Sequence, residues 1–262
     1  MHKKIVLSLF FVFLTACFQR DKQEIPQEGE IVFWKQDLEL IVKAKLGPRR
    51  EHIPSQFDYE FYRPAREHYL GQFPIDYVPE KFQPITQQQA DSLPRPDSNR
   101  QLQFDLKLGN SDFQATDGPL PDHDDQVRVR IEGLTMDMRA DNLDTYKTFI
   151  QRKEFFKENS KFEKYGLTCY QKKVADNFYG CYGKSKGQHV TGVLLNVIAL
   201  EITPSNQIAQ IRGNSYEPNK YGGIWVQWET NLNNWDKWQE IDNAIWRLLD
   251  TWNAAPSSQK SN

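Results

Sequence analysis

The stretch NNWDKWQEIDNAIWRLLDTWNAAP, residues 233–256, decides how this chain folds. Its apolar residues recur at steps of three and four, which places them on one stripe of an α-helix. Asn233 or Asn234 is suited to cap the start of this helix, and Pro256 closes the segment. A helix with one apolar stripe needs another element to cover it. The stripe consists of Trp235, Trp238, Ile241, Ile245, Leu248, Leu249 and Trp252.

Strand-like segments precede this helix and supply the surface on which it can pack. In the last of them, Ile224, Val226 and Trp228 alternate with residues that point the other way. We therefore predict an α+β domain over residues 101–256, an antiparallel β-meander sheet packed by the C-terminal amphipathic helix. The expected strands of the meander are Tyr165–Lys173, Phe178–Gly183, His189–Glu201, Gln207–Arg212 and Gly223–Thr230.

Two earlier runs also alternate apolar and polar residues, Leu102–Leu108 and Val127–Ile131. Each is typical of a strand with one buried face. The residues between them form a loop in this interpretation. A helix is predicted over Asn142–Asn159, with Asp141 or Asn142 as its N-cap.

The N-terminal part of the chain is harder to interpret. Residues 31–46 are apolar enough to be ordered, but their pattern mixes strand and helix signals. Prolines occur every six or seven positions from Pro48 to Pro96, which excludes long helices. We predict a Pro/aromatic-rich irregular region over residues 31–100, with a mobile loop at 86–100. Residues 257–262 form a polar tail.

The first residues, MHKKIVLSLFFVFLTAC, have the layout of a secretory signal peptide. Lys3 and Lys4 form the basic start, and Ile5–Leu14 is the apolar run. Ten apolar residues in a helix rise about 15 Å, half of a bilayer core, so this segment is too short to be a spanning anchor.

The tetrapeptide Leu14-Thr15-Ala16-Cys17 resembles the lipobox of bacterial lipoproteins. The resemblance implies cleavage after residue 16 and acylation of Cys17 with chains such as palmitate, followed by a tether over residues 17–30. More than one acyl chain gives stable anchoring in a lipid bilayer. Phe18 is non-acidic, which resembles the default signal for transfer to the outer membrane, facing the periplasm. The alternative is an ordinary cleaved signal peptide with Cys17 nearby by chance.

The charge of the chain argues against nucleic acid as a partner. The sequence holds 33 basic and 35 acidic residues, and removal of Lys3 and Lys4 leaves 31 against 35, a net charge of about −4. Such a chain lacks the positive surface that attracts phosphate backbones.

Lipidation of Cys17 would leave an even pair, Cys169 and Cys181, within two β-prone runs separated by polar turn residues at 175–177. The periplasm permits disulfides, so we predict a hairpin bridged by these cysteines. Two free thiols or half of a metal site are the alternatives, although no Cys-x-x-Cys motif occurs.

Six of the seven tryptophans lie in residues 225–252. Periodicity places Trp235, Trp238 and Trp252 in the core. Trp225 and Trp246 fall off the apolar stripes, which makes them the candidate binding residues, either for stacking on glycans or for contacting a partner.

No catalytic motif is present, so no catalytic residue and no cofactor is predicted. Asp122-His123-Asp124-Asp125 could supply metal ligands, but contiguous residues in one loop rarely converge on an ion. A solvated acidic turn is the preferred interpretation.

The run NSYEPNKYGGIWVQWETNLNNWDKWQEIDNAIWRLLDTWN is similar to the ends of uncharacterised proteobacterial envelope lipoproteins. Some envelope lipoproteins of this size are immunity proteins paired with type VI secretion effectors. Our first hypothesis is a non-enzymatic lipoprotein that binds an envelope or effector protein, with immunity as one form. An envelope glycan-binding module or hydrolase is the second hypothesis, and an assembly or structural lipoprotein is the third.

Overall fold

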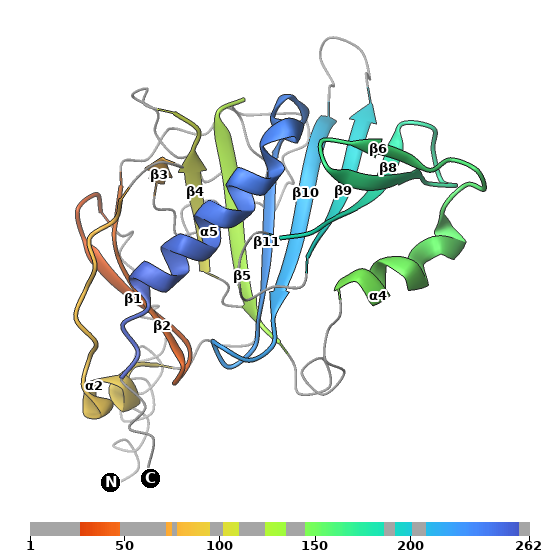
Figure 1. Ribbon diagram of the computed structural model, residues 1–262. Coiled ribbons are helices and arrows are strands. Elements are labelled where there is room, and N and C mark those ends of the chain that lie inside the picture. The colour runs from red at the N-terminus through yellow and green to blue at the C-terminus, as the bar shows by residue number, and fades with distance from the viewer. Residues whose placement is uncertain are drawn as a thin grey trace, which may run out of the picture.

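A single long helix, α5 (Trp238–Trp252), crosses one face of a nine-stranded sheet in the computed structural model (Figure 1). The structure describes residues 27–47, 72–74, 78–94, 102–109, 124–134, 145–185, 192–200 and 208–256. The strands of the sheet are, in spatial order, β3 (Gln72–Pro74), β4 (Leu102–Lys107), β5 (Gln126–Gly133), β11 (Ile224–Asn231), β10 (Ile208–Glu217), β9 (Val193–Leu200), β8 (Phe178–Gly183), β7 (Leu167–Gln171) and β6 (Phe162–Lys164).

The topology confirms the predicted α+β class. Strands β6 to β11 are neighbours in chain order and antiparallel, which is the expected meander. The sheet then continues from β11 to the earlier strands β5 and β4, and β3 adds a parallel pairing beside β4. Strands from the two ends of the domain therefore meet at β5 and β11.

The start of the C-terminal helix differs from the prediction. A 3-10 helix, η2 (Leu232–Lys237), precedes α5, and the side chain of Asn231 caps it by accepting from the Asn233 N–H at 3.0 Å. The prediction that Asn233 or Asn234 is the cap was therefore wrong. Asn234 is buried and its amide donates to Thr230 Oγ1 at 2.9 Å, so its side chain joins η2 to β11 instead.

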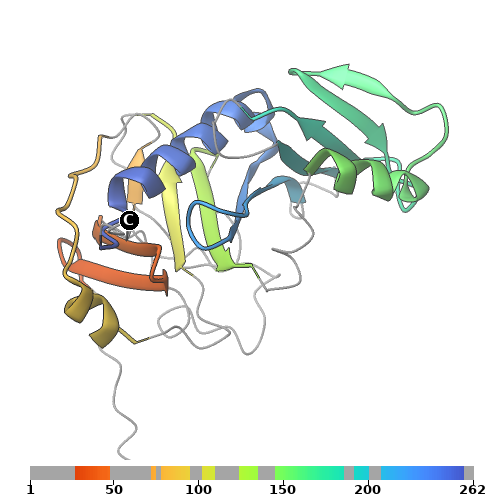
Figure 2. The same cartoon turned by 60° about the horizontal axis from the view of Figure 1, so that its bottom comes forward.

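The two faces of the sheet carry separate apolar clusters. The face under α5, which we call the α5 face, holds the larger cluster, in which Phe104 and Trp252 meet edge to face with ring centroids 5.2 Å apart. The opposite face holds a smaller cluster around Phe149 of α4 (Thr145–Gln151). Figure 2 shows α4 beside the end of the sheet that carries β6–β8.

Strand β4 is buried on both faces, so the prediction of a half-buried strand was wrong there. Its polar residues Gln103, Asp105 and Lys107 are as enclosed as its apolar ones, and the charge of Asp105 is paired across the strands. Asp105 accepts from Arg128 Nε at 3.2 Å and from the Gln126 amide at 2.8 Å. Pairing and hydrogen bonding make burial of these groups tolerable.

The N-terminal segment that gave mixed signals forms a hairpin of β1 (Ile31–Asp37) and β2 (Leu40–Lys45). Val42 of this hairpin bridges to Asn253, just beyond the end of α5. The short helix α2 (Gln87–Ser92) lies where we expected a mobile loop. Thr86 and Gln89 form a capping box there, which is a Thr-x-x-Gln signature of a helix start. The prediction missed it because it relied on the lack of aromatic residues in this segment.

The helix expected at Asn142–Asn159 is shorter than predicted. It consists of α4 followed by the 3-10 turn η1 (Arg152–Phe155). The helix ends there because Phe156 pairs with Lys172 in a β-bridge and stacks on Tyr170, with ring centroids 5.3 Å apart. The proposed caps Asp141 and Asn142 lie outside the described residues, as do the signal segment, Cys17 and residues 257–262.

Candidate functional site

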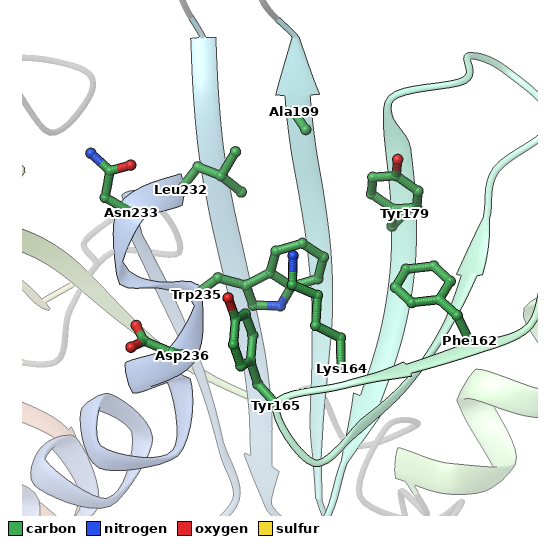
Figure 3. Close-up of a pocket in the computed structure, with 9 residues that line it drawn as sticks. All are labelled: Phe162, Lys164, Tyr165, Tyr179, Ala199, Leu232, Asn233, Trp235 and Asp236. Carbon is green, nitrogen blue, oxygen red and sulfur yellow. The ribbon is translucent and has the colours of Figure 1, made fainter.

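A pocket of about 470 Å³ opens on the α5 face, between the turn that joins β6 to β7 and the 3-10 helix η2 (Figure 3). It lies beyond the N-terminal end of α5, so the helix does not cover it. Its walls combine aromatic rings with a few polar groups. The lining residues are Phe162, Lys164, Tyr165, Tyr179, Ala199, Leu232, Asn233, Trp235 and Asp236.

The indole of Trp235 is the centre of the pocket. Tyr165 meets it edge to face, with centroids 5.8 Å apart, and Tyr179 is stacked at 6.2 Å. Phe162 extends the cluster through an edge contact with Tyr179 at 5.4 Å. Four rings, from β6, the β6–β7 turn, β8 and η2, therefore form one continuous aromatic wall (Figure 3).

The turn that carries Tyr165 has an unusual backbone. Tyr165 has φ 52° and Gly166 has φ 75°, and these two residues alone join β6 to β7. Two positive φ values match a type I′ hairpin turn, for which Asn-Gly is the favoured pair. A tyrosine in the left-handed region is strained, and strain of this kind clusters at functional sites. Tyr165 nevertheless remains 50% exposed as a residue.

Lys164 places its ammonium over the aromatic wall. Its Nζ lies 4.3 Å from the Trp235 ring centroid and 5.1 Å from that of Tyr165. Within the described part of the chain, no carboxylate forms an ion pair with Lys164. The side chain is exposed to solvent, and the two rings add a cation–π contact to its hydration.

The Trp235 ring also contains a buried donor that has no acceptor. Its Nε1 is shielded from solvent and forms no hydrogen bond, although the side chain lines the pocket. Trp238, one turn further on, differs: its Nε1 donates to the Tyr165 carbonyl at 2.9 Å. An unpaired buried N–H costs about 1–3 kcal/mol.

The predicted disulfide between Cys169 and Cys181 is present and supports this region. The two cysteines are directly paired across β7 and β8, with Cα atoms 4.0 Å apart, as expected for a non-hydrogen-bonded pair. Strand β8 supplies Tyr179 to the pocket wall, and β7 pairs with β6, which supplies Phe162 and Lys164. The crosslinked strands on one side and η2 on the other therefore hold the rings.

The candidate binding residues behave differently from the sequence prediction. Trp246 is only 4% exposed, because it stacks on Tyr221 and its Nε1 donates to Ser215 Oγ at 3.2 Å. The prediction that Trp246 lies on the surface was therefore wrong. Trp225 is half-buried on the opposite face, where it stacks on Tyr216, and the structure does not bring these two tryptophans together.

The core prediction holds for Trp235, Trp238 and Trp252, all of which are buried. Sequence reasoning therefore missed Trp235 as a pocket residue. The signal that could have found the site is the Lys164-Tyr165-Gly166 turn, in which an aromatic residue occupies a position that favours asparagine.

The acidic turn contributes to the fold beside the pocket. Asp124 accepts from the side-chain amides of Asn233, through its carboxylate at 3.3 Å, and of Asn234, through its backbone carbonyl. Asp122 and His123 lie outside the described residues. Among the residues that the structure covers, no group of three or more His, Cys, Asp or Glu could hold a metal ion.

Comparisons with known proteins place the chain in no family. No family model matches it, and neither does a curated protein. One solved structure with a distant likeness is Smlt3025, an immunity protein of the Stenotrophomonas maltophilia type IV secretion system. That match has a TM-score of 0.38 and 9% identity, and it covers 61% of this chain and 84% of that chain. Within the described residues, no helix is long and apolar enough to cross a membrane.

Proposed function

We propose that this chain is a lipid-anchored envelope protein that faces the periplasm and binds a protein partner through the Trp235 pocket, without catalysing a reaction. The lipobox-like tetrapeptide ending at Cys17 supports the anchor. The anchor restricts the partner to one that reaches the membrane surface. Inhibition of a secreted effector there, an immunity role, is the concrete form that we favour.

The observation that carries the binding site is the half-exposed ring of Tyr165, held at the pocket mouth by a strained backbone. Asparagine would make the same turn without strain, so the fold alone does not account for a tyrosine here. Exposed tyrosine and buried tryptophan next to a pocket are the residue types that dominate binding energy in protein interfaces.

The packing of the rings favours a protein over a sugar. Glycan stacking needs an open aromatic face, and the Trp235 indole already contacts Lys164 and the stacked ring of Tyr179. The pocket better fits a side chain inserted from a partner. Peptidoglycan binding is the second candidate, supported by the polar rim of Asn233 and Asp236 next to aromatic rings.

The anchor is tested with Cys17→Ser. The native chain should incorporate labelled palmitate and sediment with envelopes, and the variant should do neither. A variant that still sediments with envelopes would contradict lipid anchoring. The result does not depend on the pocket, so it tests the first half of the proposal separately.

The pocket is tested by photo-crosslinking in cells, with a photoreactive residue at position 233 on the exposed rim. We expect a protein adduct that Tyr165→Asn abolishes while the hairpin stays folded. Phe155→Ala is the matched control, because Phe155 is an exposed ring outside the pocket, 58% exposed on η1. An equal loss of the protein adduct in Tyr165→Asn and Phe155→Ala would contradict a specific binding site at the pocket. If no protein adduct forms and the chain is retained on purified peptidoglycan in a manner that depends on Tyr165, peptidoglycan binding is the favoured function.

A further inference from the structure

We infer that the Trp235 pocket selects a carboxylate on an apolar stem, supplied by an acidic side chain of the partner. This inference rests on the proposed function and names the chemistry that the pocket recognises. Its basis is two hydrogen-bond donors at the aromatic wall, the exposed ammonium of Lys164, which forms no ion pair within the described residues, and the buried Nε1–H of Trp235, which has no acceptor there.

Lys164 is the first of these donors. An ammonium can donate three hydrogen bonds and accept none. The ammonium is exposed to solvent and lies over the rings of Trp235 and Tyr165, and a cation–π contact at an exposed site is worth about 0.5–1 kcal/mol. A hydrogen bond to a carboxylate is stronger than this contact, so an incoming anion can capture the ammonium.

Trp235 Nε1 is the second donor. The N–H is buried without an acceptor, and Lys164 and Tyr165 pack against its ring in addition to the stacked Tyr179. Lys164 and Tyr165 are exposed side chains, so they can move aside without opening the core. Lys164 Nζ lies over the ring face, 4.3 Å from the indole centroid, and Nε1–H points out in the ring plane, so one carboxylate can serve both donors once the flexible Lys164 side chain swings toward the indole edge.

The rest of the pocket favours an apolar stem on that carboxylate. Phe162, Tyr179 and Leu232 provide apolar wall, and a volume of about 470 Å³ is far larger than a bare anion needs. A side chain with methylene groups or a ring would fill this space and bury the wall. Pockets of this kind combine apolar lining with a few polar groups that fix orientation.

Asp236 is the acidic group that could oppose an anion. It is exposed at the rim, and Figure 3 shows its carboxylate directed away from Lys164 and Trp235. Its charge acts through solvent, where interactions are weak and screened by salt. Asp236 therefore weakens carboxylate binding slightly rather than preventing it.

The inference is tested with the full chain in detergent micelles, labelled with 5-fluorotryptophan and observed by fluorine NMR. The chain has seven tryptophans, and Trp235→Phe assigns one resonance to Trp235. The probes are phenylacetate, the neutral phenylacetamide and the cation phenethylamine, which share one ring and differ in charge. Phenylacetate should shift the Trp235 resonance, and the other two should leave it unchanged.

Lys164→Gln keeps a polar side chain of similar length and removes the charge. We expect it to weaken phenylacetate binding about tenfold or more, since hydrogen bonds between charged groups are the strong ones. Asp236→Asn is the opposite control and should tighten binding slightly. Equal shifts by phenylacetate and phenylacetamide, or unchanged affinity in Lys164→Gln, would overturn the inference.

The two proposals fail in different ways. If Tyr165→Asn abolishes the crosslinked protein and Lys164→Gln does not change it, protein binding stands and carboxylate selection is wrong. If phenylacetate binds through Lys164 but no protein adduct forms, the carboxylate site stands and the proposed partner is wrong.

Discussion

Asp242 on α5 accepts a hydrogen bond from the Ser215 hydroxyl of β10 at 2.9 Å, at a position that solvent does not reach. Ser185 Oγ reaches its other oxygen at 3.3 Å, and Trp246 Nε1 donates to the same Ser215 hydroxyl. A carboxylate thus lies between the helix and the middle of the sheet. Burial raises the pKa of Asp242 from 3.8 to about 6, and the hydrogen bonds from serine oppose that rise.

This raised pKa predicts a specific pH dependence of stability. Between about pH 4 and about pH 6 the folded chain holds the Asp242 proton more tightly than the unfolded chain does. The contribution of Asp242 to the free energy of unfolding therefore falls as pH rises through this window and is constant above it. A shift of this size corresponds to about 3 kcal/mol at most.

Asp242→Asn isolates this effect, because asparagine has a similar shape and does not titrate. Urea denaturation of both proteins between pH 4 and pH 7 should show the variant gaining stability relative to the native chain as pH rises. The comparison cancels the titration of other carboxylates. A difference that stays constant across this pH range would contradict the assignment.

Trp246 gives a second prediction, since its position in the core departs from the sequence expectation. Trp246→Ala should lower the free energy of unfolding by about 3–5 kcal/mol, as truncation of a buried aromatic ring leaves a cavity. Phe155→Ala, which removes an exposed ring, should change stability by less than about 0.5 kcal/mol. Chemical denaturation measures both, and equal small losses would mean that Trp246 is not packed.

The elements predicted well from sequence are those whose periodicity coincides with burial. The apolar stripe of α5 and the alternating apolar residues of β11 both face the same cluster. Each pattern therefore predicted the correct helix or strand. The sequence analysis placed Trp246 on the surface because it lies off the apolar stripe. In the structure α5 is buried on more sides than that stripe covers. Tyr221, from the turn before β11, packs against that ring, and no helical pattern contains such a contact.

The pocket could not be predicted because its parts are distant in sequence. Tyr165 and Trp235 are 70 positions apart and meet only when the β6–β7 turn packs against η2. Trp235 also lies in the 3-10 helix that the Asn231 cap begins, before α5 starts at Trp238. Sequence patterns describe one element at a time, and this site lies where two elements meet.

The disulfide supplies a third prediction. Replacing Cys169 and Cys181 together with alanine should lower the free energy of unfolding by about 2–4 kcal/mol, because the crosslink restricts the unfolded chain. Both cysteines are buried, so reduction of the native protein should need partial unfolding. Thermal unfolding with and without a reductant provides the measurement. Cys17→Ser should leave the transition unchanged, and an equal loss in that variant would argue against the crosslink as the cause.

Gly213 of β10 lies directly opposite Trp228 of β11, and the indole occupies the space where a side chain would project. A Cβ on Gly213 would lie 2.1 Å from Trp228 Cε2, which is far inside contact distance. Gly213→Ala should therefore cost about 1–3 kcal/mol through forced displacement of the buried ring. In a Trp228→Leu background the same change should cost much less, because the clashing indole is gone. Urea denaturation of the four proteins gives the coupling energy between the two positions. A coupling near zero would show that the cost comes from the backbone of β10 and not from the contact with Trp228.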